Sequence, residues 1–378
     1  MTVVIVEGQL VLRDRVTPGW VEVEGDRISA VVADRATEAG QDGPYICPGF
    51  VDIHVHGWGG QDAAGGLEAL DGMARALVAH GVTSFLPTAE TVPLGALAEF
   101  ADHARAFIDQ RQTNRAEALG FNLEGPFISP RRTGAQNPAH IRRPADVDRR
   151  VLEQLVPASR VWTVAPEVDG ALSLIRWLSD CGVAVSLGHS DATAEEASAG
   201  FDAGARSTTH LFNAMTALDH HAPGLAAVAL ARNDVFVELI ADGLHVDRWL
   251  WPTVVRAKPG RVVAVSDAIS PAGMGDGEWL VGGLEVAVRA GECRLVSNGR
   301  LAGSVIALDD AVSNLVGSGV TLPDAVAAAS RVPLECIGVT DRGRLEVGAV
   351  ADMVELDADL RVRGVMKSGR WLIPSGGA

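Results

Sequence analysis

The feature that most constrains the fold is an alternation of short apolar runs with helix-like segments through the middle of the chain. Helix-like segments such as 67–80, 94–109, 171–181 and 193–204 separate most of the short apolar runs, which are strand candidates. Eight such alternations within about 220 residues predict an α/β fold, a (β/α)8 TIM-like barrel with a parallel sheet. The predicted strands are 51–56, 83–87, 120–124, 161–165, 184–189, 207–212, 235–241 and 262–267.

The two ends of the chain have a different character, with β-like runs and turn signals but no helical pattern. Gly25 and Asp26 separate two such runs and indicate a hairpin, and 352–373 has turn signals at 357–359 and 368–369. We therefore expect residues 1–47 and 344–378 to form one small β-sandwich domain beside a catalytic barrel domain of 48–343. Two unrelated β appendages are the alternative.

A glycine-rich stretch at 270–303 follows the last predicted strand and interrupts the alternation. Its composition predicts an insertion of hairpins and loop. Because it follows a strand of the barrel, it should lie at the end of the barrel where active sites are built.

The formal net charge of −16 argues against nucleic acid and acidic membrane surfaces as partners. No stretch approaches the ~20 apolar residues of a membrane span, and no signal-peptide pattern is visible, so the expected location is the cytoplasm. The cysteines are far apart and form no CxxC pair, which argues against a zinc ribbon or a disulfide scaffold. They are Cys47, Cys181, Cys293 and Cys336.

Five of the eight predicted strands end in side chains that can bind metal. In a barrel of this kind the C-terminal strand ends surround the active site, so these side chains should converge. Imidazole and carboxylate ligands suit zinc, iron, cobalt or manganese. The residues are His54 and His56 on the first strand, Glu124 on the third, His189 on the fifth, His210 on the sixth and Asp267 on the eighth.

The spacing of His54 and His56 places both imidazoles on the same face of the first strand. A metal held there would lower the pKa of bound water to about 7 and polarise a carbonyl group. Asp267 could then take the proton of that water and pass it to a leaving nitrogen. The alternative for Asp267 is a helix N-cap.

Seven motifs resemble the amidohydrolase superfamily and, within it, the N-acetylglucosamine-6-phosphate deacetylases. The first of them marks only the superfamily, whereas LEGPF, THLFNAM and ADGLHVD together are specific to the deacetylases. The resemblance covers essentially the whole chain. The motifs are PGFVDIHVHG (48–57), LEGPFISPRRTGAQNP (123–138), LGHSDAT (187–193), THLFNAM (209–215), PGL (223–225), ADGLHVD (241–247) and SDAISPAG (266–273).

The resemblance implies removal of acetate from N-acetylglucosamine 6-phosphate to give glucosamine 6-phosphate, with Asp267 as the acid/base. It also implies one or two divalent metals per subunit, with zinc favoured over iron, manganese or cobalt. Many relatives in the superfamily bridge two metals with a carbamylated lysine near mid-barrel, but here Lys258 and Lys367 are the only lysines and neither is placed to bridge. In the deacetylases a glutamate takes that place, and Glu124 lies in the matching motif. The implied ligands are Glu124, His189 and His210 for the principal metal, and His54 and His56 for a second.

The same resemblance implies substrate contacts and a homodimer. His245 would contact the sugar or the carbonyl, and Asn213 and Ala214 the phosphate. Gln136 replaces a family histidine that contacts the sugar, and it can hydrogen-bond but carries no charge. His221 replaces an arginine that reaches into the neighbouring subunit to hold the phosphate, and it lacks the planar fork of that residue.

These two departures leave the substrate open. The alternatives are N-acetylgalactosamine 6-phosphate or an unphosphorylated N-acetyl sugar, a different amidohydrolase reaction, and a non-catalytic sugar-phosphate sensor. A basic cluster on the loop after Glu124 could replace the missing arginine, or it could be a solvated surface loop. Its members are Arg131, Arg132, Arg142 and Arg143.

Overall fold

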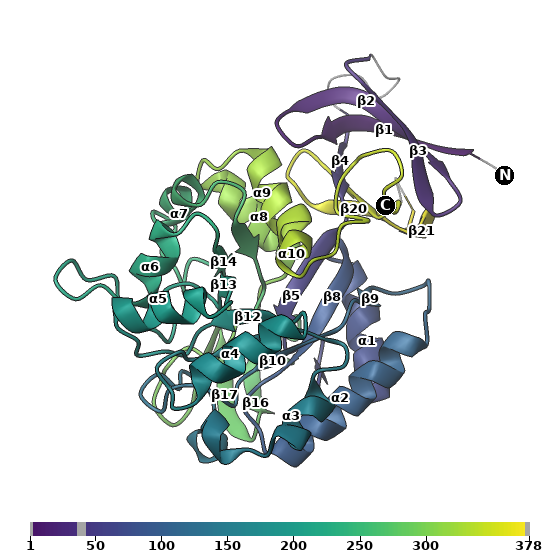
Figure 1. The fold of residues 1–378 in the computed structure, drawn as a ribbon. Helices are drawn as coiled ribbons and strands as arrows, with labels where there is room; N and C mark the ends of the chain where they lie inside the picture. The colour runs from purple at the N-terminus through teal and green to yellow at the C-terminus, as the bar shows by residue number, and fades with distance from the viewer. Residues whose placement is uncertain (1–2, 36–42, 375–378) are drawn as a thin grey trace.

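A parallel sheet of eight strands forms the centre of the computed structural model, which describes residues 3–35 and 43–374 (Figure 1). Each of the eight runs expected from the sequence contributes a strand, so the predicted barrel is confirmed. In sheet order the strands are β5 (Phe50–Val55), β8 (Val82–Ala89), β10 (Phe121–Glu124), β11 (Ser159–Val164), β12 (Ala184–Leu187), β13 (Ser207–Thr208), β14 (Phe236–Leu239) and β15 (Val262–Ala264). The short strand β9 (Glu117–Ala118) pairs with β8.

Backbone hydrogen bonds just beyond β15 bring the last strand back to the first. The N–H of Asp267 donates to the carbonyl of His54 at 2.9 Å, and the N–H of His56 donates to the carbonyl of Ala268 at 2.8 Å. These bonds place Asp267 beside the two histidines, although more than 200 residues separate them in sequence. No helix follows Asp267 directly, since the next helix begins at Leu308, and the helix N-cap alternative is therefore excluded.

Helices cover the outside of the barrel, and the predicted ones are present with small shifts at their ends. The helix predicted at 193–204 begins after a capping box in which Thr193 and Glu196 bond each other's backbone. The helices are α1 (Leu67–Val78), α2 (Leu94–Asp109), α3 (Arg149–Leu155), α4 (Ala171–Asp180), α5 (Ala194–Asp202), α6 (Leu225–Ala231), α7 (Trp251–Ala257), α8 (Leu308–Gly317), α9 (Leu322–Ala329) and α10 (Arg331–Cys336).

The inside of the barrel is filled by apolar side chains at the end opposite the candidate ligands. Val51, Ile53 and Val263 from the strands form one buried cluster with Leu334 and Cys336 of α10. The helix therefore closes the N-terminal mouth of the barrel. This leaves the C-terminal mouth as the open end, where barrels of this type carry their chemistry.

The two chain ends meet in one seven-stranded sheet, as expected from the sequence. Strand β19 pairs with β4, which joins the C-terminal strands to the N-terminal ones. The domain boundaries 1–47, 48–343 and 344–378 remain predictions, and 1–2, 36–42 and 375–378 lie outside the described residues. The order is β21 (Arg370–Ile373), β20 (Val362–Lys367), β19 (Met353–Leu356), β4 (Tyr45–Pro48), β1 (Val3–Val11), β2 (Val16–Glu24) and β3 (Arg27–Ala33).

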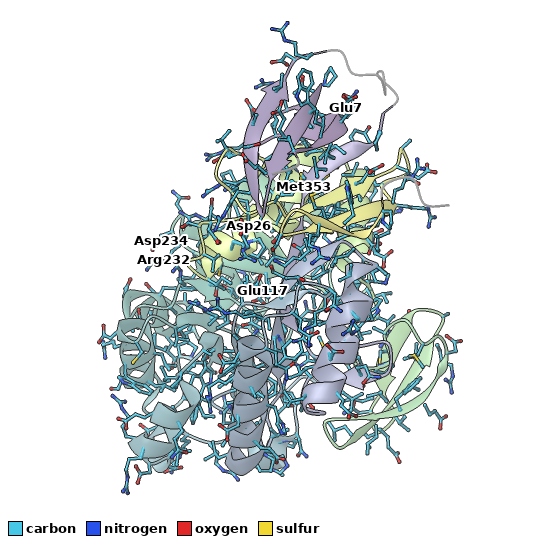
Figure 2. The ribbon with its side chains drawn as sticks, turned by 90° about the vertical axis from the view of Figure 1, so that its right-hand side faces the viewer. Glu7, Asp26, Glu117, Arg232, Asp234 and Met353 are labelled. Carbon is cyan, nitrogen blue, oxygen red and sulfur yellow. The ribbon has the colours of Figure 1, made fainter. Side chains whose placement is uncertain are left out.

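An ion-pair cluster joins this sheet to the barrel. Lys367 Nζ lies 2.8 Å from Glu117 Oε2 and 3.2 Å from Asp352 Oδ2, and Arg342 Nη1 contacts the same two carboxylates. Burial alone would raise the pKa of Glu117, but the charges of Lys367 and Arg342 lower it to about 2. Figure 2 shows Glu117 where the sheet of the chain ends meets the barrel.

The insertion predicted at 270–303 is a separate three-stranded antiparallel sheet. In Figure 2 it projects from the end of the barrel opposite the sheet of the chain ends. Its inner face packs an apolar cluster that includes Val286, Val288, Leu295 and Ile269. The strands are β16 (Gly277–Val281), β17 (Leu284–Arg289) and β18 (Glu292–Leu295).

Candidate metal centre and active site

Three of the predicted ligands form a compact buried group at the ends of neighbouring strands. Glu124 ends β10, His189 follows β12 and His210 follows β13. Glu124 Oε1 lies 3.0 Å from His189 Nε2 and 2.9 Å from His210 Nε2, and the two imidazole nitrogens are 3.1 Å apart. These atoms converge on one point, as the side chains of a metal site do.

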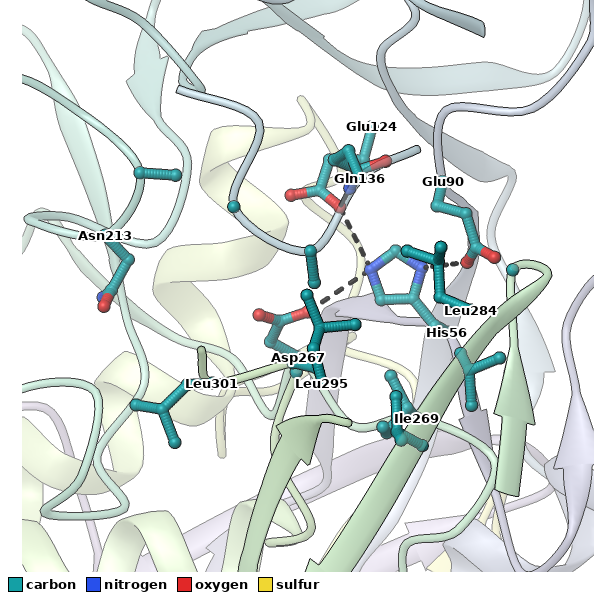
Figure 3. Close-up of a pocket in the computed structure, with 18 of the residues that line it drawn as sticks. His56, Glu90, Glu124, Gln136, Asn213, Asp267, Ile269, Leu284, Leu295 and Leu301 are labelled. Carbon is teal, nitrogen blue, oxygen red and sulfur yellow. Dashed lines mark hydrogen bonds and ion pairs between the residues drawn. The ribbon is translucent and has the colours of Figure 1, made fainter. Parts of the chain in front are cut away.

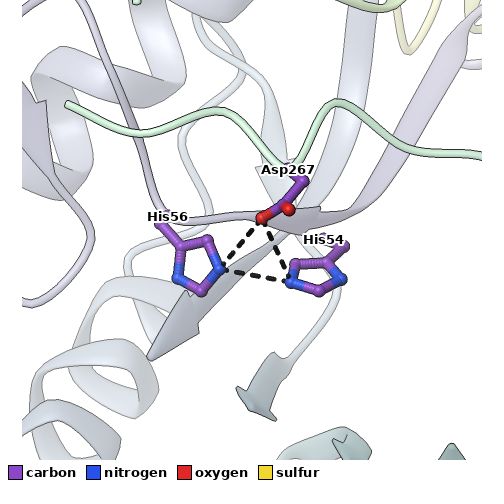
Figure 4. Close-up of side chains that lie close together, drawn as sticks. All are labelled: His54, His56 and Asp267. Carbon is purple, nitrogen blue, oxygen red and sulfur yellow. Dashed lines mark hydrogen bonds and ion pairs between the residues drawn. The ribbon is translucent and has the colours of Figure 1, made fainter. Parts of the chain in front are cut away.

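A second group lies beside the first and contains His54, His56 and Asp267 (Figure 4). The Nε2 atoms of the two histidines are 3.2 Å apart. Asp267 Oδ1 lies 3.5 Å from His54 Nε2 and 3.3 Å from His56 Nε2. The two imidazoles therefore share one face of the first strand, as the sequence spacing predicted.

Glu124 lies between the two groups. Its Oε1 is 3.5 Å from His54 Nε2, and its Oε2 is 3.3 Å from His56 Nε2. One carboxylate thus faces both groups. Lys258 donates to the carbonyls of Ala229 and Arg232, outside these two groups. Lys367 belongs to the ion-pair cluster that joins the sheet of the chain ends to the barrel.

The donor atoms of both groups fit divalent cations. In each group two imidazole Nε2 atoms face each other at about hydrogen-bond distance, next to a carboxylate oxygen. His189 Nδ1 lies 2.9 Å from the carbonyl oxygen of Arg132, and His54 Nδ1 lies 2.9 Å from Glu238 Oε2. Such acceptors hold the proton on Nδ1 and leave the Nε2 lone pair for a metal.

Electrostatics at the site favour ionised carboxylates. Burial would raise the pKa of Glu124, but the charges of His54 and His189 and the hydrogen bonds of His189 and His210 lower it well below its ordinary value. Burial likewise opposes ionisation of Asp267, and the neighbouring imidazoles of His54 and His56 lower its pKa. The site therefore concentrates negative charge at the convergence point of the imidazoles.

Three of these residues have left-handed backbone conformations, with φ of 45° at His189, 29° at His210 and 48° at Asp267. Histidine and aspartate adopt this region more readily than most residues, but it still costs about 1–3 kcal/mol where it is held. The backbone N–H of His210 is fixed by a 3.1 Å bond to Glu238 Oε2. Backbone strain of this kind is thus present at three of the strand ends that aim the candidate ligands.

A cavity of about 240 Å³ opens beside both groups (Figure 3). Four of the predicted substrate contacts line it, namely Gln136, Asn213, Ala214 and His245. The opposite wall is apolar and comes from the segment after β15 and the three-stranded sheet. It consists of Ile269, Val281, Leu284, Val286, Leu295, Leu301 and Ala302.

Gln136 bonds to the protein through both ends of its amide. Its Oε1 accepts the backbone N–H of Thr91 at 2.6 Å, and its Nε2 donates to Glu124 Oε2 at 2.6 Å. A backbone donor on one side and a carboxylate on the other fix the orientation of the amide. Its predicted contact with substrate stays a prediction, and the geometry adds a second task, which is to brace Glu124.

Asn213 also uses its amide inside the protein. Its Nδ2 lies 3.2 Å from the carbonyl oxygens of both His210 and Leu211. Its backbone N–H donates to the carbonyl of His210 at 2.9 Å. The amide nitrogen is therefore committed to the turn that carries His210, a use that is common for asparagine.

His245 is oriented by an aspartate that the sequence argument did not single out. Asp242 Oδ2 lies 2.6 Å from His245 Nδ1, and Asp242 Oδ1 accepts the backbone N–H groups of Leu244 and His245 at 2.8 Å each. Burial would lower the pKa of His245, but its bond to Asp242 raises it. The signal was available, because Asp242 belongs to the same ADGLHVD motif.

Two glutamates near the ligands were also missed. Glu90 follows β8 and lines the cavity, with its Oε2 3.5 Å from His56 Nδ1 (Figure 3). Burial raises the pKa of the neighbouring Asp62 carboxyl to about 6, and the negative charge of Glu90 contributes to this rise. Glu238 lies inside β14 and inside the predicted strand 235–241. Inspection of strand interiors as well as strand ends would therefore have found it.

The remaining predicted residues lie away from the cavity. His221 is exposed on the loop before α6, where its ring packs on His220, and it does not line the cavity of its own chain. The basic cluster is also engaged elsewhere, since Arg131 and Arg132 pair with Asp191. Arg142 binds the carbonyls of Ala139 and Ile141, and Arg143 pairs with Asp146.

The four cysteines are unpaired, as expected from their spacing. Across residues 3–35 and 43–374, no helix combines the length and apolar character needed to cross a membrane.

Comparison with known proteins gives a consistent set of relatives. Residues 45–372 match the model of the amidohydrolase family. The N-acetylgalactosamine-6-phosphate deacetylase of Escherichia coli O157:H7 is 36% identical over 368 residues, which cover 93% of this chain and 95% of the relative. The N-acetylglucosamine-6-phosphate deacetylase of Bacillus subtilis (strain 168) is 34% identical over 363 residues, which cover 91% and 90%.

Solved structures agree with these relatives over the whole fold. An N-acetylglucosamine-6-phosphate deacetylase from Thermotoga maritima superposes with a TM-score of 0.91 at 34% identity, covering 98% of this chain and 100% of that one. An aspartate-to-alanine mutant of the Mycobacterium smegmatis enzyme, in complex with N-acetyl-D-glucosamine-6-phosphate, gives 0.89 at 32% identity and covers 99% and 100%.

Proposed function

The chain belongs to the amidohydrolase family and is a hydrolase, and from this premise we propose that it deacetylates N-acetylglucosamine 6-phosphate to glucosamine 6-phosphate and acetate. The observation that carries the proposal is the convergence of two imidazole–carboxylate groups on one cavity. Relatives named as deacetylases of N-acetyl amino-sugar phosphates match this chain over about nine-tenths of its length.

Glu124, His189 and His210 would hold the principal divalent metal, and His54, His56 and Asp267 would surround a second. Zinc suits such a donor set, and iron, manganese and cobalt are the alternatives. A metal bound there would lower the pKa of water and polarise the acetamido carbonyl. All six side chains belong to strand ends of the rigid barrel, so the site is built before substrate arrives.

Asp267 would move the proton that the reaction requires. Its carboxylate accepts a proton from water as the water oxygen bonds to the acetamido carbonyl carbon. It then delivers this proton to the sugar nitrogen as the carbon–nitrogen bond breaks. Acetate and a free amino sugar are the products, and Asp267 returns to its starting state.

Substrate contacts would come from His245, from the backbone of the turn at Ala214, and from Gln136 at the edge of the cavity. Asp242 keeps His245 in place. Because His221 lies on an exposed loop outside its own cavity, we place it at the phosphate of a neighbouring subunit in a homodimer. Four unpaired thiols fit a reducing compartment, so we place the enzyme in the cytoplasm.

N-acetylgalactosamine 6-phosphate is the second candidate substrate. The E. coli relative named for that substrate is 36% identical over 93% of this chain. Gln136 also stands where a histidine would contact the sugar, and it is committed to Glu124 and Thr91. A changed contact at that point can change the preference between epimers.

The test measures acetate release from N-acetylglucosamine 6-phosphate, its galacto epimer and unphosphorylated N-acetylglucosamine, each with added zinc, manganese or iron. A higher kcat/KM for the first substrate supports the proposal. Preference for the epimer selects the second candidate. If metal-loaded protein releases acetate from none of the three, the proposed function is wrong.

A further inference from the structure

Glu238 is a buried carboxylate that touches both candidate metal groups. It lies in β14 and is 1% exposed. Its Oε2 lies 2.9 Å from His54 Nδ1, in the second group, and 3.1 Å from the backbone N–H of His210, in the first. Its Oε1 is buried and has no hydrogen-bond partner among the described residues.

The contact with His54 determines which nitrogen of that ring is free. An ionised carboxylate only accepts hydrogen bonds, so His54 Nδ1 must carry a proton to bond with it. The Nε2 lone pair then faces His56 and Asp267, where a cation would sit. A carboxylate behind a ligating imidazole also raises its basicity and fixes its orientation.

The other histidine of the second group has no comparable support. His56 Nδ1 is 3.5 Å from Glu90 Oε2 and lacks a hydrogen-bond partner among the described residues. The orientation of the second group therefore depends chiefly on Glu238 acting through His54. Burying a carboxylate is unfavourable unless it is paired, and a cation one imidazole away supplies the missing charge.

We propose that Glu238 is a positioning residue, which holds the His54 ring so that its Nε2 faces the cation of the His54–His56–Asp267 group. This inference rests on the proposed metal-dependent function. It goes further by naming a residue outside the ligand set on which the affinity of that second site depends.

The variant Glu238→Gln removes the charge and keeps the shape. The amide oxygen can take the place of Oε2 and accept both donors, and the amide nitrogen can take the place of the unpartnered Oε1. Metal-free protein is titrated with zinc against a chromogenic chelator, and bound zinc per chain is measured after dialysis. We expect two zinc ions in the wild type, and a roughly 10–100-fold weaker affinity for one of them in the variant.

Glu355→Gln is the matched control, since Glu355 is also a buried glutamate but lies in β19, in the sheet of the chain ends. It should bind two zinc ions with wild-type affinity. His54→Asn should weaken the same zinc ion as Glu238→Gln. Because Glu238 acts through His54, the double variant should bind no more weakly than His54→Asn alone.

The outcomes separate this inference from the proposed function. Two zinc ions of unchanged affinity in Glu238→Gln, or a single zinc ion in the wild type, would overturn the inference and leave a metal-dependent deacetylase intact. A wild type that binds no metal would overturn the proposed function itself. If the variant does not fold, nitrogen NMR of the wild type decides: protonated Nδ1 at His54 supports the inference, and protonated Nε2 alone refutes it.

Discussion

Asp267 is the residue on which the proposed reaction depends most directly, and Asp267→Asn tests its role with little disturbance of the fold. The residue is 8% exposed and its φ is 48°, in the left-handed region. Asparagine tolerates that region as well as aspartate does, whereas alanine would add backbone strain. The amide has the same shape as the carboxylate but cannot take up or release the proton.

The expected loss is worked from the acid/base function that the substitution removes. A positioned general acid/base contributes about 10²–10⁴-fold to rate. At ~1.4 kcal/mol for each factor of ten, this corresponds to about 3–5 kcal/mol of transition-state stabilisation. Since Glu124, His189 and His210 are untouched, the principal metal should remain bound.

The assay is kcat/KM for acetate release, with zinc content and thermal stability measured on the same preparation. Asp276→Asn serves as the control, because Asp276 is an exposed carboxylate on the loop after the same strand and accepts the backbone N–H of Ala290. The control should match the wild type. A metal-loaded Asp267→Asn enzyme within tenfold of wild-type kcat/KM would refute the assigned role.

Three further predictions concern positions outside the reacting atoms. Lys367→Met leaves the buried Asp352 with Arg342 as its remaining cation. Urea denaturation should therefore show a free energy of unfolding lower by about 3 kcal/mol, the low end for a broken buried pair. A decrease under about 1 kcal/mol would contradict this prediction. Burial would lower the pKa of His80, but its bond to Asp309 raises it. The extra stability of the wild type over His80→Asn should therefore be fully present below about pH 6.5 and be lost as the pH rises through the raised pKa. Denaturation curves in which this difference grows with pH would contradict the prediction. Gln136→Leu removes the hydrogen-bond donor to Glu124, so zinc titration should show ~10–100-fold weaker binding of the principal metal. An unchanged zinc affinity would argue against the role of Gln136 in holding Glu124.

The sequence was sufficient for the barrel and for most of the candidate ligands. Alternation between strand and helix is a local pattern, and the rule that barrel chemistry lies at C-terminal strand ends needs no coordinates. His54, Glu124 and His210 were found in this way, and each lies at the predicted strand end. The pairing of both chain ends in one sheet also followed from local β patterns.

The roles of Gln136 and Asn213 could not be read from the sequence. Both line the cavity, where substrate contacts were expected, and their amides also bond to Glu124, Thr91 and the turn at His210. A side-chain amide has donors and an acceptor, so its use depends on which groups the fold places beside it. Sequence similarity identifies the position and leaves that choice open.

The sequence by itself determined the order of strands and helices and which side chains stand at the mouth of the barrel, because both depend on periodicities of a few residues. The tertiary structure alone decided which distant residues meet. Closure of the barrel brings Asp267 to His54, and strand register places Glu238 behind the same imidazole. Such contacts depend on the stagger and twist of the whole sheet, which no local pattern encodes.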